Sequence, residues 1–335
     1  MGSIFFLVSG FTACTLLIVW SGSRLSRYGD IIAELTGMGK AWFGLIMMAA
    51  VTSLPELVTG ISSVVIVDSP DIAVGDVMGS CAFNLLILAI LDYFVPGKPL
   101  LSSVTKGHIL AGLFGIVLLS LAVVSIIYGS QVPVIGWFSS SSILLIILYL
   151  VALRTIFQNE KQSSVMEPVK TEHNDHEYIP LDKAVKKYIL FSLVVVSAAL
   201  ALPFFADQIA EQSGISKTFV GTLLVAATTS LPELVVSIAA VRMGSMDIAV
   251  GNLLGSNIFN MLILALDDLM YTRGPLLPNS NPDHALGGLA AILMTAIVGI
   301  GILYSKPNKR FVLGIDAIVL IAVYISMIIS LYRMG

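Results

Sequence analysis

The heptapeptide Thr52-Ser53-Leu54-Pro55-Glu56-Leu57-Val58 occurs twice in this chain, the second time letter for letter as Thr229-Ser230-Leu231-Pro232-Glu233-Leu234-Val235. A second segment, Asp71-Ile72-Ala73-Val74-Gly75, recurs as Asp247-Ile248-Ala249-Val250-Gly251. The two copies of the first segment (52 and 229) are one residue further apart than the two copies of the second segment (71 and 247). The copies therefore run in register, with one residue lost between the segments in the second copy. The chain therefore contains an internal repeat.

The composition is that of a membrane protein. Of 335 residues, 57% are hydrophobic and 12% are charged, whereas about a quarter of a soluble domain is charged. The apolar residues form long blocks without an amphipathic stripe, such as 4–20, 110–127 and 141–153, which predict membrane helices. No basic segment precedes the first block, so we expect it to be a transmembrane helix rather than a cleaved signal.

Apolar stretches separated by polar breaks predict an all-α integral membrane protein with ten transmembrane helices. Their ranges are about 4–22, 41–66, 70–92, 107–127, 133–153, 188–206, 216–241, 246–268, 284–304 and 311–331. The long polar segment 155–187 is interpreted as a cytoplasmic linker between a first repeat, 1–154, and a second repeat, 188–335. Five helices is an odd number, so the second repeat must enter the membrane with the opposite sense. This inverted design is typical of secondary transporters.

Positive charge predicts the orientation of the chain. With the N-terminus outside, 15 of the 18 Lys and Arg residues fall on the inner side and 3 on the outer side. The rule that inner loops are rich in Lys and Arg then places both termini outside. We expect the plasma membrane as the location, membrane lipid as a partner, no nucleic acid, and a monomer.

The two glutamates are the first candidates for chemistry. Glu56 and Glu233 lie within apolar helices, where a carboxylate costs about 2.5–3.5 kcal/mol on insertion scales and normally faces a cavity or a partner. Pro55 and Pro232 precede them and remove the helical hydrogen bond to the carbonyl four residues back, which predicts that helices 2 and 7 are broken. Carboxylates beside hydroxyls and freed carbonyls suit hard cations such as Ca²⁺ or Na⁺.

The following helix of each half carries a second row of polar residues, spaced i, i+4, i+8. The rows are Asp76, Ser80 and Asn84 in the segment 75–84, and Asn252, Ser256 and Asn260 in the segment 251–260. Each row lies on roughly one helix face. Gly75 with Gly79, and Gly251 with Gly255, give the GxxxG spacing that permits close helix approach.

At these residues the sequence resembles the sodium/calcium exchanger superfamily, whose two repeats carry Gly-Thr-Ser-Leu-Pro-Glu and then Gly-Asn-x-x-Gly-Ser-Asn. The resemblance spans nearly the whole chain and implies antiport of Na⁺ and Ca²⁺ by alternating access, with both ions as cargo and no cofactor. By motif position, it implies a ligand set of Glu56, Glu233, Thr52, Ser53, Thr229, Ser230, Ser80, Ser256, Asn84 and Asn260, with the carbonyls of Ala49 and Ala226.

The chain departs from the family pattern in three places. Val51 and Thr228 replace the glycine that opens the motif, Asn260 stands where many members have aspartate, and Asp76 stands where the first repeat often has asparagine. One hypothesis is that Asp76 supplies the ligand charge that Asn260 lacks. The alternative is that Asp76 lies on the pathway outside the ligand set.

Several functions compete with Na⁺/Ca²⁺ exchange. A proton-coupled exchanger of the same superfamily is the nearest, and Mg²⁺ or another divalent cation could be the cargo. A cation channel would also use oxygen-lined polar residues, but inverted repeats with broken helices are more typical of alternating access. An enzyme is not expected, because the sequence has no His-Glu-x-x-His or Gly-x-Gly-Asp motif.

The remaining polar residues are assigned no chemistry. We expect Asp92, Asp267 and Asp268, near helix ends, to lie at the membrane interface. His108 and His284 fall at helix starts without metal-ligand spacing. Cys14 and Cys81 lie in apolar segments and do not predict a disulfide framework.

Overall fold

The computed structural model describes residues 4–36, 49–164, 179–242, 244–304, 308–309 and 311–334. Eight described helices are long and apolar enough to cross a membrane. They are α1 (Ile4–Thr36), α5 (Pro70–Tyr93), α6 (His108–Ile127), α7 (Ser140–Ser164), α8 (Leu181–Ser213), α12 (Met246–Met270), α14 (His284–Tyr304) and α15 (Ile315–Met334).

Two shorter sets of helices hold the repeated heptapeptide. The first consists of α3 (Ala49–Thr52), α4 (Leu54–Ser62) and the π-helix η2 (Ser63–Val67); the second consists of α9 (Lys217–Phe219), the π-helix η5 (Val220–Val225), α10 (Ala226–Thr229) and α11 (Leu231–Arg242). In the second set, 217–229 and 231–242 form one span bent by 43°. The described residues thus contain eight spans, or nine with this pair, and not all of the ten predicted. Residues 41–48, where the second predicted helix begins, lie outside the described part.

Short elements connect the long helices. They are the 3-10 helices η3 (Leu100–Ser103) and η4 (Gly129–Gln131), the antiparallel strands β1 (Val134–Ile135) and β2 (Phe138–Ser139), and α13 (Leu276–Asn279). Several predicted ends were wrong: α1 continues to Thr36 instead of ending at position 22, and α7 and α8 extend into the predicted linker 155–187. Residues 165–178 of that linker lie outside the described part of the chain.

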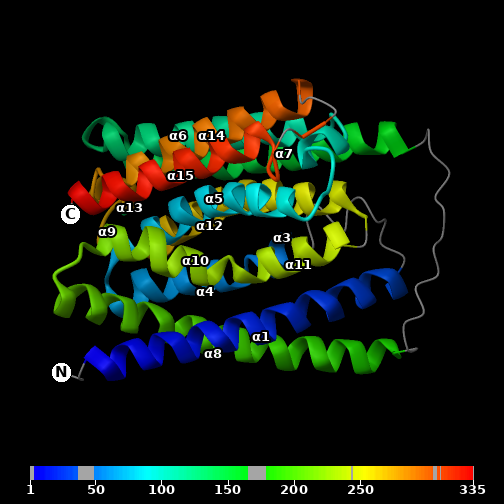
Figure 1. Cartoon of the computed structure of the whole chain (residues 1–335). Helices are drawn as coiled ribbons and strands as arrows, with labels where there is room; N and C mark the ends of the chain where they lie inside the picture. The colour runs from blue at the N-terminus through cyan, green and yellow to red at the C-terminus, as the bar shows by residue number, and fades with distance from the viewer. Residues whose placement is uncertain are drawn as a thin grey trace.

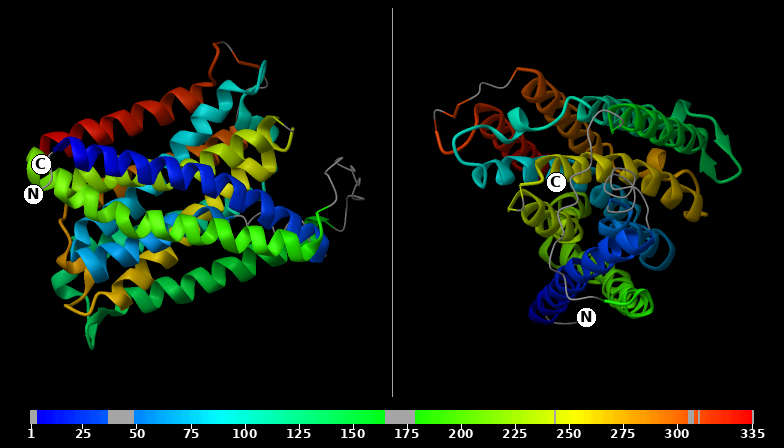
Figure 2. Two further views of the ribbon diagram at one scale, coloured as in Figure 1. Left: turned by 90° about the horizontal axis from the view of Figure 1, so that it is seen from below. Right: turned by 90° about the vertical axis from the view of Figure 1, so that its right-hand side faces the viewer.

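The helices are stacked in layers, as Figures 1 and 2 show. The two 33-residue helices α1 and α8 pack along each other at one face of the bundle. The broken helices lie next to this pair, α5 and α12 form the middle, and α6, α7, α14 and α15 cover the opposite face. The heptapeptides are therefore held between the α1–α8 pair and the central helices.

The apolar core is divided in the same way. The main cluster joins α5 and α12 to α6, α7, α14 and α15, with fully buried residues such as Leu85, Leu118 and Leu264. A separate cluster packs α1 and α8, through Ile18 and Leu202, against the broken helix of the second half at Val220 and Val225. The α1–α8 pair is therefore not part of the main core.

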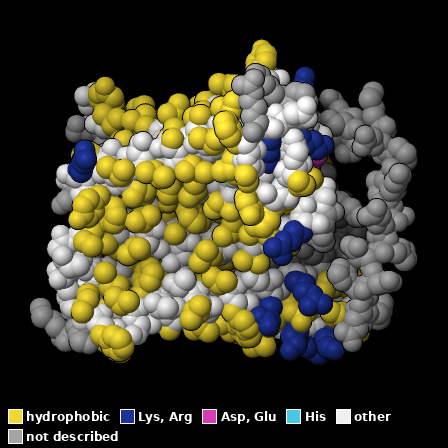
Figure 3. Space-filling view, in the orientation of Figure 1, with side chains coloured by type: hydrophobic (Ala, Val, Ile, Leu, Met, Phe, Trp, Pro, Cys, Tyr) yellow, Lys and Arg dark blue, Asp and Glu magenta, His cyan; other side chains and the backbone are white. Residues whose placement is uncertain are grey.

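Hydrophobic side chains cover the flank of the bundle. Figure 3 shows them over most of the visible face, with Lys and Arg gathered mainly near one end. Exposed residues such as Phe5, Leu193 and Ile300 would be costly in water, and the broad apolar surface fits a lipid environment. α1 begins and α15 ends at the same end of the bundle, opposite the end rich in Lys and Arg (Figures 1 and 3). The chain is a membrane protein.

Two carboxylates at helix starts join the halves of the chain. Asp71 accepts hydrogen bonds from the backbone of Asn281 at 2.7 Å and from His284 Nε2 at 3.0 Å. Asp247 in turn accepts from the backbone of Thr105 at 2.7 Å and pairs with His108 Nε2 at 2.9 Å. In the register of the repeat that pairs Asp71 with Asp247, Thr105 corresponds to Asn281 and His108 corresponds to His284. The two aspartates therefore have equivalent partners. Both histidine side chains, predicted to have no site role, are buried parts of the scaffold.

The aspartates near helix ends, predicted at the membrane interface, are buried within the protein. Asp92 is 2% exposed and Asp268 is 0% exposed. Asp92 Oδ1 accepts from the Leu100 amide at 2.6 Å, and Asp268 Oδ1 accepts from the Leu276 amide at 2.5 Å, eight residues ahead in both cases. These hydrogen bonds hold the chain where it folds back after α5 and α12. The folded-back segments bury the two carboxylates.

Candidate functional site

Each heptapeptide interrupts its helix at the serine. α3 ends at Thr52 and α4 begins at Leu54; α10 ends at Thr229 and α11 begins at Leu231. Pro55 and Pro232 stand in the first turn of the second segments, where a missing N–H costs no helical hydrogen bond. The break therefore follows from the prolines, as predicted, although the motif lacks its opening glycine.

The glutamates are oriented by serines of the opposite half. Ser53 Oγ donates to Glu233 Oε1 at 3.0 Å, and Ser230 Oγ donates to Glu56 Oε1 at 3.1 Å. Both glutamates are fully buried, and Oε2 of each has no hydrogen-bond partner among the described residues. The two heptapeptides thus build one reciprocal cluster, with one oxygen of each carboxylate free for a ligand.

Asp76 joins this cluster from α5. Its Oδ1 accepts from the Thr229 hydroxyl at 2.8 Å, with the Ser80 hydroxyl 3.5 Å away. Asp76 is fully buried, and its second oxygen is unpartnered within the described chain. Asp76 therefore lies beside two residues of the predicted ligand set rather than at a remote entrance.

The other predicted ligands surround the carboxylates. Ser256 Oγ lies 3.5 Å from Glu233 Oε1, and Ser80 Oγ lies 3.5 Å from the Ala226 carbonyl oxygen. The Thr52 hydroxyl donates to the Ala49 carbonyl at 3.2 Å. Hydroxyls and carbonyl oxygens from both halves therefore adjoin the carboxylates.

The two predicted asparagine ligands use their amide nitrogens within the protein. Asn84 Nδ2 donates to Asn257 Oδ1 at 3.0 Å, and Asn260 Nδ2 lies 3.8 Å from Cys81 Sγ. Oδ1 of Asn84 and of Asn260 is buried, without a hydrogen-bond partner in the described part of the chain. Both side chains thus present a free oxygen.

The predicted close approach at Gly75 and Gly79 is observed, and it is made across the halves. A Cβ on Gly79 would lie 2.2 Å from the Thr222 carbonyl oxygen, and one on Gly75 would lie 3.0 Å from Gly221 Cα. α5 of the first half therefore packs directly on η5 of the second half. This contact holds Asp76 and Ser80 against Thr229.

The donor set defines which cations fit. Among the residues that the structure describes, no three His, Cys, Asp or Glu side chains gather closely enough to hold a metal ion by themselves. A cation here must combine single carboxylates with hydroxyl, amide and carbonyl oxygens. Such an all-oxygen set suits hard ions and does not suit soft transition metals.

Comparison with known proteins gives the family. The sequence pattern described as "Sodium/calcium exchanger protein" matches residues 6–158 and 187–333, nearly the whole chain. The chain belongs to the sodium/calcium exchanger protein family. It is accordingly an antiporter of that superfamily, and the family is one of transporters.

Individual relatives agree with this assignment. The exchanger is 26% identical to the uncharacterized membrane protein MJ0091 of Methanocaldococcus jannaschii over 97% of this chain and 98% of that one. It is 48% identical over 88 residues, 24% of this chain and 25% of the relative, to the sodium/calcium exchanger MaX1 of Methanosarcina acetivorans. Its fold resembles that of the sodium-calcium exchanger NCX_Mj with a TM-score of 0.64 at 24% identity, covering 98% and 99% of the two chains.

Two buried residues near the site were not predicted. Asn257 donates to the Cys81 carbonyl at 3.0 Å and accepts from Asn84, so it fixes the amide of a predicted ligand. The second-repeat sequence Gly255-Ser256-Asn257 contained that signal. Asp267 is fully buried against Gly60 of α4, although its position near a helix end suggested the interface.

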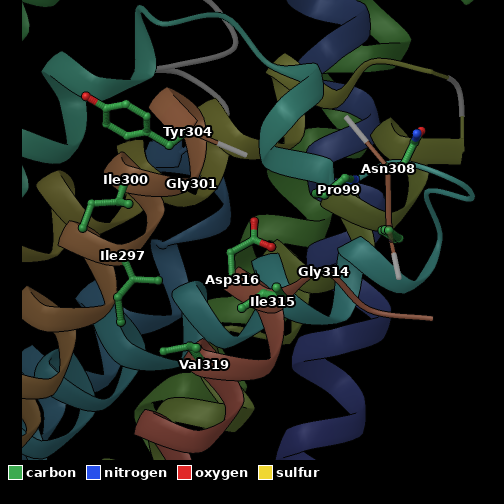
Figure 4. Close-up of a pocket in the computed structure, with 11 residues that line it drawn as sticks. Pro99, Ile297, Ile300, Gly301, Tyr304, Asn308, Gly314, Ile315, Asp316 and Val319 are labelled. Atoms are coloured by element: carbon green, nitrogen blue, oxygen red, sulfur yellow. The ribbon is translucent and has the colours of Figure 1, made fainter. Parts of the chain in front are cut away.

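The exchanger also has a cavity that is separate from this site. It has a volume of about 390 Å³ and lies between α14 and α15, lined by apolar residues such as Ile297 and Ile300 (Figure 4). Asp316 and Lys309 supply its charged groups, and it shares no residue with the predicted ligand set. Its composition does not suit a buried cation with several oxygen ligands.

Proposed function

We propose that the exchanger couples Na⁺ movement in one direction to Ca²⁺ movement in the other by alternating access. The observation that carries the proposal is the reciprocal pair Ser53–Glu233 and Ser230–Glu56, which places two carboxylates from the two halves in one buried cluster. Either one Ca²⁺ or several Na⁺ ions can neutralise this cluster, but the cluster cannot bind Ca²⁺ and the full set of Na⁺ ions at the same time. That exclusion produces exchange.

The proposed ligands are the predicted set with Asp76 added. Free oxygens on Glu56, Glu233, Asp76, Asn84 and Asn260 support it. Without a cation, these buried carboxylates would have no compensating positive charge, which is strongly unfavourable in the membrane interior. Movement of the empty site between its two access states is therefore suppressed, and uncoupled leak with it.

The proposed architecture is two inverted five-helix repeats, 1–154 and 188–335, joined by the cytoplasmic linker 155–187. Paired contacts support it. In Asp71–His284 the aspartate belongs to the first half and the histidine to the second, and in Asp247–His108 the reverse is true. With ten crossings and the Lys- and Arg-rich end inside, both termini face outward. We place the exchanger in the plasma membrane as a monomer surrounded by lipid.

The α1–α8 pair is proposed as the element that moves between access states. Its apolar cluster is separate from the main core, so it can shift without opening that core. It also touches both broken helices: Ser62 of α4 donates to the Leu200 carbonyl of α8, and Gly22 of α1 packs on Pro232. A shift of the pair therefore acts directly beside the glutamates.

The test is Ca²⁺ uptake into proteoliposomes under separate Na⁺, K⁺ and H⁺ gradients, repeated with Mg²⁺. We expect uptake to follow the Na⁺ gradient and to be abolished in Glu56→Gln and in Glu233→Gln. The variant Glu211→Gln, on the exposed end of α8, is the matched control. Full retention of uptake in both site variants contradicts the mechanism. Uptake driven only by a pH gradient identifies a proton-coupled exchanger. Unsaturable flux that is independent of a counter-ion identifies a channel.

A further inference from the structure

Asp267 is a buried carboxylate that the reciprocal cluster does not use. It is 0% exposed near the C-terminal end of α12, and neither of its oxygens has a hydrogen-bond partner among the described residues. Its neighbour Asp268 accepts from the amides of Ser139 and Leu276. Asp268 is thus stabilised as a scaffold residue, whereas Asp267 has no compensating group. A buried charge without a partner is strongly unfavourable.

The carboxylate of Asp267 lies close to the central site. It packs on α4 at Gly60, where a Cβ would lie 2.3 Å from Oδ2 and 2.7 Å from Oδ1. Gly60 follows Glu56 by four residues, so both lie on one face of α4, about 6 Å apart along the helix axis. Asp267 is therefore about one helical turn from the proposed ligands.

Two other buried oxygens, one on α4 and one on α5, lack hydrogen-bond partners among the described residues. Thr59, next to Gly60, has a buried hydroxyl that forms no hydrogen bond within the described chain, and Asp76 Oδ2 is free in the same sense. A proton would satisfy one carboxylate oxygen only. A metal cation takes several oxygen ligands at once, and an oxygen set of low charge suits Na⁺.

The charge balance leaves buried carboxylates that either protons or a further cation must neutralise. Glu56, Glu233, Asp76 and Asp267 are four buried carboxylates, and one Ca²⁺ neutralises two of them.

The Asp267 arrangement is found in one half only. In the register that pairs Asp71 with Asp247, the counterpart of Asp267 is the buried Leu91. In the register that pairs Thr52 with Thr229, the counterpart of Gly60 is Ser237, which accepts from Asn252 Nδ2 at 3.3 Å. The fold therefore does not require a carboxylate at this place.

We propose that Asp267 is the charged ligand of a further monovalent-cation site, beside Gly60 and between the central cluster and the end of the bundle where α12 ends, and that its occupant is Na⁺. The proposal rests on the proposed function in taking Na⁺ as the coupling ion. Binding at Asp267 raises the number of Na⁺ ions that the exchanger holds by one, without adding a Ca²⁺ ligand.

The test measures ion binding without transport. The melting temperature of the purified full chain is followed at fixed pH and ionic strength while NaCl replaces choline chloride, and separately against CaCl₂. The variants are Asp267→Asn, Asp267→Leu, which copies Leu91, and the control Asp182→Asn at the exposed start of α8. The slope of the melting temperature against log Na⁺ concentration reports the number of ions bound.

We expect the slope of both Asp267 variants to fall by one Na⁺, while the Ca²⁺ concentration for half-maximal stabilisation changes less than threefold. In choline both variants should melt at or above the wild-type temperature, because an unpaired carboxylate has been removed. An unchanged slope of the melting temperature against log Na⁺ concentration overturns the proposal. Failure of both variants to fold also overturns it, and so does stabilisation of the wild type by acid but not by Na⁺. Failure of the proposed function is recognised separately, by wild-type Ca²⁺ uptake into proteoliposomes that does not follow the Na⁺ gradient.

Discussion

The hydroxyl of Ser53 donates a hydrogen bond to Oε1 of Glu233, 3.0 Å away and 180 residues later in the chain. Each half of the exchanger thus orients the carboxylate of the other half. In the proposed mechanism, a cation bound at the glutamates contacts both halves simultaneously, and its release frees both. This arrangement links occupancy of the site to the relative position of the two halves.

Removal of this donor should weaken Ca²⁺ binding. Ser53→Ala loses a hydrogen bond to a charged group, which is worth about 1.5–3 kcal/mol, or roughly a 10- to 100-fold change in affinity. We expect at least a tenfold higher Ca²⁺ concentration for half-maximal uptake in proteoliposomes, and the same for Ser230→Ala. Ser197→Ala is the matched control, because that hydroxyl only donates to a carbonyl of its own helix. Values equal to this control would contradict the prediction.

Asp76 is predicted to be part of the ion site and not an entrance residue. Its Oδ1 accepts from Thr229 at 2.8 Å, and its other oxygen is free. Asp76→Asn keeps the shape and removes the charge, so we expect Ca²⁺ affinity to fall at least tenfold and the charge moved per Ca²⁺ to change. Reversal potentials under defined gradients measure the charge, with Asp182→Asn on the exposed start of α8 as the control. Unchanged affinity and coupling would place Asp76 outside the ligand set.

The sequence predicted the two helix breaks and the glutamates beside them, because these features are local. Proline sets the helix break, and a carboxylate in an apolar helix must be compensated, whatever surrounds it. The repeat then indicated that two such sites exist. The sequence could not show that Ser53 serves Glu233, since the crossing of the halves depends on packing between residues far apart in the chain.

Errors arose where polar residues were assumed to mark helix ends. The first helix was predicted to end at about position 22, but the Ser23 hydroxyl donates to the Val19 carbonyl at 2.7 Å and Arg24 lies 4.4 Å from the Trp20 ring centroid. These side chains are satisfied on the helix itself, so α1 continues. The burial of Asp92 and Asp268 could not be predicted, because their amide partners are contributed by loops that only the fold brings near.

Close packing of α5 on η5 should not tolerate a side chain at Gly79. A Cβ there would lie 2.2 Å from the Thr222 backbone oxygen, which cannot rotate away. Overpacking of this kind costs about 1–3 kcal/mol, so we expect Gly79→Ala to lower the melting temperature and Ca²⁺ uptake together. Gly115→Ala, where no described atom lies within 4 Å, is the control and should be neutral or stabilising. Equal melting temperatures for the two variants would show that α5 and η5 separate freely.

The histidine–aspartate pairs should matter for stability and not for ion binding. Asp247→Ala removes the acceptor for the Thr105 amide and His108, and Asp71→Ala removes that for the Asn281 amide and His284. An unmade buried hydrogen bond costs about 1–3 kcal/mol. We expect lower melting temperatures in both variants, partial recovery in Asp247→Asn and Asp71→Asn, and wild-type Ca²⁺ affinity of the folded fraction. A change in affinity without a change in melting temperature would instead assign these residues to the ion pathway.

If the α1–α8 pair moves between access states, fixing α1 to the second broken helix should stop transport. Thr15 of α1 and Thr228 of α10 lie with their hydroxyl oxygens 3.3 Å apart, a separation close enough for cysteines to be joined with little backbone movement. The variant Thr15→Cys/Thr228→Cys is made with Cys14 and Cys81, both free thiols, replaced by serine in a background first shown to transport. Oxidation should abolish Ca²⁺ uptake and a reductant should restore it, while the two single-cysteine variants respond to neither. Transport that continues through the oxidised, cross-linked protein would mean that α1 stays fixed against α10 during exchange, and that the moving element must be sought among the other helices.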